Sequence, residues 1–149
     1  MVTATRRIQF CAGHRVFQHE SKCRNIHGHN YVLLFTAQFE KKVDALGRVM
    51  DFSVLKAKLG GGIEKYWDHG FIYYSQDPEM TSLFFGNKNY KSFTISVNPT
   101  AENMAEYLLL HVCPILFEKT GVTITRIELW ETENCRAEVS LTPPEIPHA

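Results

Sequence analysis

Residues 31–41 read YVLLFTAQFEK and residues 7–18 read RIQFCAGHRVFQ. The first stretch is rich in aromatic and β-branched residues, and the second has the pattern of a strand interrupted at Gly13. Both stretches therefore predict long β-strands. Residues 19–30, HESKCRNIHGHN, join them and carry one cysteine and three histidines. The connection between the two strands thus holds side chains that are able to do chemistry.

Two helices are predicted by apolar residues at helical spacing. Asp51 can cap the first helix, and Thr100 can cap the second, which ends at Gly121. The glycine run 60–62 lies inside the first pattern, where each glycine costs about 1 kcal/mol relative to alanine. We therefore expect a kink or a break there. Residues 67–90, between the two helices, are expected to form a loop.

Three further strands are predicted, a short one over 92–97 and longer ones over 122–132 and 135–141. Strands followed by helices and then by strands predict an α+β domain, with an antiparallel sheet and helices on one face. The second faces of the strands still carry large apolar residues, so we expect other copies of the chain to cover them. The alternative is a monomer with scattered exposed apolar residues. One domain is expected over 1–149, with a flexible tail over 142–149.

Composition excludes several classes of protein. The chain has 149 residues, of which 16 are basic and 16 acidic, so no basic field favours nucleic acid or an anionic membrane as a partner. No apolar run approaches the roughly 20 residues of a membrane span, and the first residues lack the apolar core of a signal peptide. A cytoplasmic location is therefore expected.

The four cysteines contain no Cys-x-x-Cys pair, so we expect neither a disulfide scaffold nor a structural zinc finger. Cys23 differs from the others in its polar, basic neighbours. The remaining three thiols are expected to be buried as small hydrophobic residues: Cys11, Cys113 and Cys135.

Three histidines have the spacing of a metal site. His27 and His29 are two residues apart in an extended chain and therefore point to the same face. His14, on the neighbouring strand, could supply a third imidazole. Three neutral imidazoles with an open fourth position describe a catalytic zinc site. The alternative is that all three are ordinary surface or turn histidines.

Cys23 lies four residues before His27, between Lys22 and Arg24. Cationic neighbours and a nearby divalent metal favour the thiolate, so Cys23 is a candidate base or nucleophile. Two alternatives are an ordinary exposed cysteine and a fourth zinc ligand, which would close the site.

Two carboxylates are further candidates. Asp68 precedes His69, and an acid beside a histidine can orient the imidazole, provided that an irregular turn at Gly70 brings the two side chains together. Glu131, near the end of a strand, could accept two N–H bonds from a guanidine-like edge of a ligand. The alternative for Glu131 is a solvated charge at a strand end.

The chain resembles the superfamily of 6-pyruvoyltetrahydropterin and 6-carboxytetrahydropterin synthases from about residue 7 to residue 141. Six blocks carry the resemblance in order: Phe10-x-Ala12-x-His14, CRNIHGHNY at 23–31, Asp51-Phe52, Asp68-His69, PTAEN at 99–103, and Trp130-Glu131-Thr132. The resemblance implies the tunnelling fold, a four-stranded antiparallel sheet with two helices on one face. Three subunits would close a barrel, and two trimers would stack into a homo-hexamer.

The resemblance also implies a role for each candidate. The zinc ligands fall on His14, His27 and His29, and the catalytic thiol falls on Cys23. Asp68 and His69 would reach the site from a neighbouring subunit, as a proton relay. The carboxylate that anchors the pterin, also part of the relay, falls on Glu131, and two further residues match the lining of the pocket: Thr100 and Glu102. Two features depart from the family, Gly70-Phe71-Ile72 after the Asp-His pair and the glycine run 60–62.

The activity implied by the resemblance is a zinc-dependent lyase acting on 7,8-dihydroneopterin triphosphate. The carboxy branch, of the queuosine pathway, resembles a pattern with three residues between the thiol and the first histidine of the pair, and the pyruvoyl branch one with five. Here there are three, 24–26. We therefore expect 6-carboxy-5,6,7,8-tetrahydropterin, acetaldehyde and triphosphate as products, with 6-pyruvoyltetrahydropterin as the alternative.

Two readings from other classes stay open. A non-catalytic subunit that binds zinc or pterin would need neither the thiol nor the Asp-His pair. A zinc hydrolase is disfavoured because no Glu or Asp is expected close to the histidine cluster as a water-activating base. No motif for a nicotinamide cofactor or ATP is present.

Overall fold

The computed structural model describes residues 1–142. The tail predicted over 142–149 lies, apart from Thr142, outside the described residues. None of the helices within residues 1–142 is long and apolar enough to cross a membrane.

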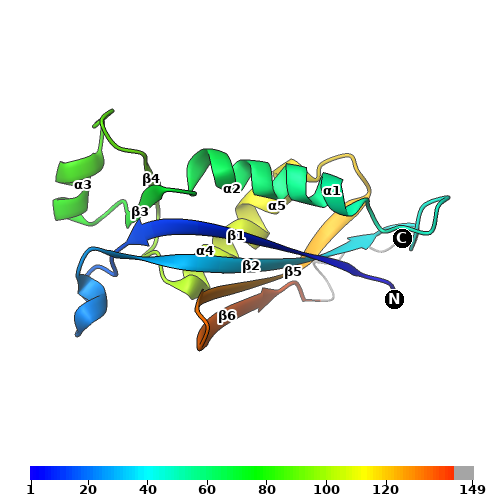
Figure 1. Ribbon diagram of the computed structural model, residues 1–149, viewed down its shortest axis with the longest axis horizontal. Coiled ribbons are helices and arrows are strands. Elements are labelled where there is room, and N and C mark those ends of the chain that lie inside the picture. Colours follow the sequence, from blue (N-terminus) through cyan, green and yellow to red (C-terminus); the bar gives the residue numbers. More distant parts are fainter. Residues whose placement is uncertain (143–149) are drawn as a thin grey trace.

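A six-stranded sheet forms the centre of the molecule, in the order β4-β3-β1-β2-β5-β6 (Figure 1). The pairs β1–β2, β2–β5 and β5–β6 are antiparallel, whereas β1–β3 and β3–β4 are parallel. The strands span β1 Ala4–His14, β2 His27–Phe39, β3 Gly70–Tyr74, β4 Ser92–Ile95, β5 Val122–Thr132 and β6 Cys135–Ser140.

The four long strands expected to pair antiparallel do so, as β1, β2, β5 and β6. The expected number of strands is wrong, because β3 and β4 extend the sheet in parallel. The added strand β3 lies in the stretch 67–90 that we expected to be a loop, as does the helix α3 (Pro78–Phe84). The first four residues of β3 are buried. A strand buried on both faces has no polar–apolar alternation, so its sequence, GFIYY, lacks the signal by which a half-exposed strand is recognised.

Two long helical segments cover one face of the sheet (Figure 1). The predicted caps are confirmed: Asp51 accepts a hydrogen bond from the N–H of Ser53, and Thr100 accepts one from the N–H of Asn103. Each segment contains a wide π-type turn. The first comprises α1 (Phe52–Leu55), η2 (Lys56–Gly60) and α2 (Gly61–Tyr66); the second comprises α4 (Ala101–Tyr107), η3 (Leu108–Val112) and α5 (Cys113–Leu116).

The glycine run does not break the first segment, because Gly60 and Gly61 both keep right-handed helical dihedral angles. A side chain at Gly60 would come within 3.9 Å of Ile8 in β1. The glycine therefore lies where the helix passes close over the sheet.

The core lies between these helices and the inner face of the sheet. Tyr31, Leu33 and Phe35 alternate along β2 and are fully buried, and they pack with apolar side chains of the helices. In an extended strand every second residue shares a face. The inner face of β2 therefore continues from Tyr31 back to His29 and His27.

Candidate metal centre and active site

The three histidines predicted as metal ligands converge at one end of the sheet. His14 ends β1 and pairs directly with His27, the first residue of β2. The ring centroids lie 4.6 Å apart for His14 and His27, 5.1 Å for His14 and His29, and 5.0 Å for His27 and His29. One ring nitrogen of each histidine lies within 4.8 Å of the others, so the cluster comes from strand pairing.

The hydrogen bonds of two of the imidazoles define which nitrogen is free. Nδ1 of His14 lies 2.7 Å from the carbonyl oxygen of Pro99, and Nδ1 of His27 lies 2.7 Å from that of Asn25. A carbonyl oxygen only accepts hydrogen bonds, so both Nδ1 atoms carry the proton and both Nε2 atoms keep a lone pair. Nε2 of His14 is buried and has no hydrogen-bond partner among the described residues.

The electrostatics of the cluster favour the neutral form of His14 and His29. Burial, reinforced by repulsion from His27 and His29, lowers the pKa of His14 to about 4, although the Pro99 carbonyl acts in the opposite direction. Burial and His27 also lower the pKa of His29. A buried imidazole with an unpartnered Nε2, as at His14, is a donor that zinc prefers, so the three converging histidines fit such an ion.

Glu131, on β5, lies beside the histidines. Its Oε1 is 3.7 Å from Nε2 of His14 and 3.9 Å from Nε2 of His29. Burial and the negative charge of Glu102 raise the pKa of Glu131, partly offset by His27. The expectation that no Glu or Asp lies close to the histidine cluster is therefore wrong.

Thr100 and Glu102 belong to the start of α4, which lies over the cluster. The carbonyl of the preceding residue, Pro99, holds His14, and Glu102 is close enough to affect Glu131. The Thr100 hydroxyl is engaged as the helix cap. Its observed role is therefore to begin the helix that places Glu102.

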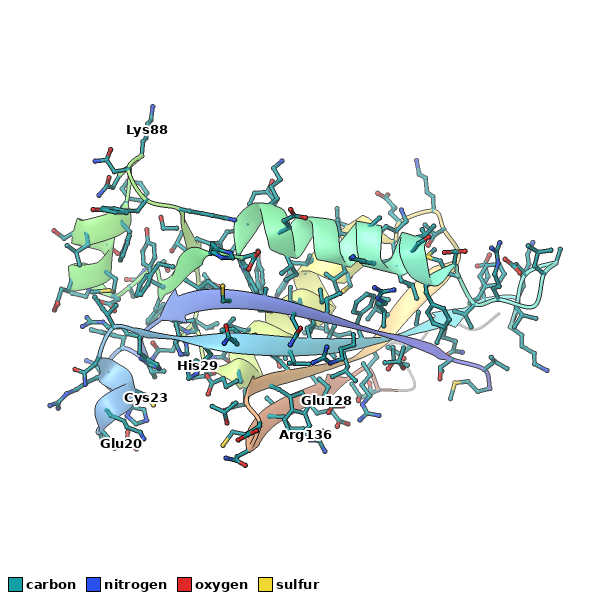
Figure 2. All side chains as sticks on the ribbon, viewed as in Figure 1. Glu20, Cys23, His29, Lys88, Glu128 and Arg136 are labelled. Carbon is teal, nitrogen blue, oxygen red and sulfur yellow. The ribbon has the colours of Figure 1, made fainter. Side chains whose placement is uncertain are left out.

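Cys23 lies on the short helical turn η1 (Lys22–Arg24), in the loop that leads into the paired histidines. Figure 2 shows Cys23 on this loop and His29 on β2 at the same end of the molecule. The N–H of Val16 donates to the Cys23 carbonyl at 2.9 Å. Cys23 does not belong to the three-histidine group.

Asp68 and His69 form a close pair, but on another side of the sheet. Oδ1 of Asp68 lies 3.1 Å from Nδ1 of His69, and the predicted irregular turn is confirmed by a φ of 61° at His69. Asp68 accepts a hydrogen bond from the N–H of Cys11, and its Oδ1 lies 3.8 Å from the Cys11 sulfur. The side chain of Cys11 points to the face of β1 opposite to that of His14.

Sequence reasoning missed the residues that hold the loop around the site. Asn98 accepts a hydrogen bond from the N–H of Phe17 and donates one to its carbonyl. Arg15 donates two hydrogen bonds to Asp77, whose side chain is 1% exposed. The segments 15–17, 77 and 98 are far apart in sequence, and no periodic pattern connects them.

The expectation of three buried thiols is also wrong. Only Cys113 is buried, whereas Cys11 is half-buried and Cys135 is exposed. Cys11 lies between the inward residues Phe10 and Ala12 of β1, so the alternation of the strand turns it outward.

Comparison with known proteins identifies the family. The family model described as 6-pyruvoyl tetrahydropterin synthase matches residues 3–141. The chain belongs to the 6-pyruvoyl tetrahydropterin synthase family. A member named 6-carboxy-5,6,7,8-tetrahydropterin synthase, from Rickettsia bellii, is 40% identical over 139 residues, covering 93% of this chain and all of the relative.

Solved structures show the same fold. An uncharacterized protein of Wolinella succinogenes matches with a TM-score of 0.77 and 22% identity, covering 93% of this chain and 97% of the other. The 6-pyruvoyl tetrahydropterin synthase of Caenorhabditis elegans matches with a TM-score of 0.66 and 22% identity, covering 95% and 96%. The expected tunnelling fold of the single chain is thus confirmed, apart from the strand count, and the closing of a barrel by three subunits stays a prediction. The expectation of an enzyme of the 6-carboxytetrahydropterin synthase type is confirmed by the named relatives.

Proposed function

We propose that this member of the family is a zinc-dependent 6-carboxy-5,6,7,8-tetrahydropterin synthase. It would convert 7,8-dihydroneopterin triphosphate and water to 6-carboxy-5,6,7,8-tetrahydropterin, acetaldehyde and triphosphate, in the cytoplasm and for queuosine synthesis. The observation that carries the proposal is the set of three converging imidazoles in a chain 40% identical to a protein named as this synthase.

His14, His27 and His29 would hold the zinc ion through their Nε2 atoms. When bound, the ion supplies a Lewis acid for the hydroxyl groups of the substrate side chain. The carbonyl oxygens of Pro99 and Asn25 hold two of the rings in the tautomer that leaves Nε2 free. Such partners orient the imidazoles and raise their basicity.

Glu131 would anchor the pterin ring. A carboxylate with two free lone-pair directions can accept both N–H groups of a guanidine-like edge. The half-buried position of Glu131 beside Glu102 makes its negative charge costly without a partner. Two N–H donors of a ligand would relieve that cost, so pterin binding is favoured at this position. Thr100 and Glu102 would line the same pocket.

Cys23 would transfer protons along the substrate side chain, with the Asp68–His69 pair as its relay. Within one chain, Asp68 is held by the backbone N–H of Cys11. Cys11 lies three residues, or about 10 Å, from His14 along β1, and its side chain points to the opposite face of the sheet. A second copy of the chain would therefore supply the pair. This supports an assembly of trimers closed into a barrel and stacked as a homo-hexamer.

The decisive test is incubation with 7,8-dihydroneopterin triphosphate and identification of the products by mass spectrometry. Acetaldehyde together with the carboxy product supports the proposal. If 6-pyruvoyltetrahydropterin is the sole product, the carboxy assignment is wrong although the synthase class is retained. Cys23→Ala should abolish turnover and keep zinc, whereas the matched variant Cys135→Ala, at an exposed thiol on β6, should keep both.

Metal content tests the ligands independently of turnover. We expect about one tightly bound zinc per chain, with strong loss in His27→Ala and His29→Ala and none in His19→Ala, which lies in the same loop. Full zinc content in both of the first two variants would refute the site.

A mixing experiment tests whether two chains share one site. Mixing inactive Cys23→Ala with inactive His69→Ala should restore some activity, because a mixed interface can contain one intact set of catalytic residues.

A further inference from the structure

A second cluster of metal-binding side chains lies outside the three-histidine site. The Cys11 sulfur is 3.5 Å from Nε2 of His69, 3.6 Å from its Nδ1, and 3.8 Å from Oδ1 of Asp68. Oδ1 of Asp68 is 3.1 Å from Nδ1 of His69. Among the described residues, this group and the three histidines are the two sets whose ligand atoms all lie within 4.8 Å.

The backbone brings the three side chains together. The N–H of His69 donates to the Cys11 carbonyl at 2.6 Å, and the N–H of Cys11 donates to Asp68 at 3.0 Å. The parallel pairing of Ala12 with Gly70 continues this contact into the sheet. The cluster is thus assembled by strand pairing, and the alternation of β1 places Cys11 on the face opposite to His14.

The distances agree with the coordination sphere of a tetrahedral ion. Zinc binds sulfur at about 2.3 Å and nitrogen or oxygen at about 2.0–2.2 Å, so neighbouring ligand atoms are about 3.3–3.6 Å apart. The separations within the cluster, 3.1–3.8 Å, span this value. The sulfur is almost equidistant from the two ring nitrogens of His69 and therefore faces the ring. Because 77% of the His69 side chain is exposed, the ring can turn to aim one nitrogen at an ion.

We propose that Cys11, Asp68 and His69 form a second site for a thiophilic divalent cation, for which zinc is the favoured ion because the ligand set combines a thiolate with an imidazole. The Cys11 thiol releases its proton as the metal–sulfur bond forms, and water completes the coordination. If Asp68 and His69 are the relay of the proposed function, an ion here removes them from proton transfer. Zinc in excess of the tight site then inhibits the enzyme.

Cobalt(II) distinguishes this site from the first one. Thiolate bound to cobalt gives an intense charge-transfer absorption in the near ultraviolet, and three imidazoles do not. Titration of cobalt(II) into the zinc-loaded protein should produce this band in the natural sequence, in Cys23→Ala and in Cys135→Ala. The band should be lost in Cys11→Ala and in Cys11→Ser, and both variants keep the backbone N–H that holds Asp68.

The outcomes separate this proposal from the proposed function, because the absorption needs no substrate. The site would be overturned by any of three results: no cobalt–thiolate band in the unmutated protein, a band that persists in Cys11→Ala, or a band that is lost in Cys23→Ala. Where turnover is measured, excess zinc should inhibit the natural sequence at least tenfold more strongly than Cys11→Ala. Equal inhibition of the two would overturn the inhibitory role.

Discussion

Gly28 separates two of the candidate zinc ligands, and we expect its replacement by alanine to damage both stability and metal binding. A Cβ atom at Gly28 would lie 2.9 Å from the carbonyl oxygen of Ala12 and 3.5 Å from Cα of Gly13. Both atoms belong to the backbone of β1, so no side-chain rotation can relieve the contact. The strands β1 and β2 must move apart instead.

The size of the effect follows from that contact. An ordinary van der Waals separation begins near 3.4 Å, so the backbone of β1 or β2 must move by about half an ångström. A functional site must hold its side chains within about the same distance of their working positions. Overpacking of this kind costs about 1–3 kcal/mol. For a domain of this length, about 2 kcal/mol lowers the Tm by about 4–8 °C. Zinc affinity should fall at the same time, since His27 and His29 flank the displaced residue.

Gly61→Ala is the matched control, with the opposite sign. A Cβ atom at Gly61 meets no atom within 4 Å, and the residue has helical dihedral angles. Alanine should therefore stabilise the helix by about 1 kcal/mol. Thermal unfolding at equal chain concentration and metal analysis measure both variants. This reasoning would be refuted if Gly28→Ala kept its full zinc content and its Tm were equal to or higher than that of the unmutated protein.

Two further predictions concern the supports of the site. Asp77→Asn should lower the free energy of unfolding by about 3 kcal/mol, since it leaves Arg15 without its buried partner. Burial raises the pKa of Asp77, but the hydrogen bonds from Arg15 outweigh burial and the pKa is lowered. The ionised Asp77 therefore stabilises the fold fully above its ordinary pKa, and this stabilisation is lost as the pH falls through the lowered pKa. In denaturant titrations, the difference in unfolding free energy between Asp77→Asn and the unmutated protein should narrow below about pH 4. Lys91→Met should cost about 1 kcal/mol because Nζ donates to the Asp68 carbonyl at 2.5 Å, and it should weaken the cobalt band. Lys88→Met, at a side chain that points away from the sheet (Figure 2), should change neither quantity.

Much of the fold could be predicted because most of its strands have one exposed face. The alternation along β2 indicates both the strand and its inward side, and that side includes His27 and His29. The helix caps Asp51 and Thr100 could be recognised because capping depends on a single residue and its local hydrogen bond. The three-histidine cluster could be anticipated for the same reason, since it depends on spacing within and between adjacent strands.

The parallel half of the sheet could be predicted only in part: the short strand expected over 92–97 is β4, but β3 and the parallel pairing have no local signal. β3 is nearly continuously buried, and β4 is only four residues long. Their place beside β1 is decided by tertiary packing, which no window of the sequence contains. The Arg15–Asp77 pair depends on the same arrangement, since Asp77 caps the helix that follows β3.

Cys11 shows how strand pairing changes the meaning of a residue. As a lone thiol in an apolar strand it is expected to be a small core residue. The alternation of β1 turns it outward, and the pairing of Ala12 with Gly70 brings Asp68 and His69 to it. Because of this register, Asp68 and His69 lie on the opposite side of the sheet from His14 of the same chain. A relay built from Asp68 and His69 therefore requires two copies of the chain, whereas the second metal site requires only one. A monomeric form should consequently lose turnover yet keep the cobalt–thiolate absorption, and this difference tests both assignments in one protein.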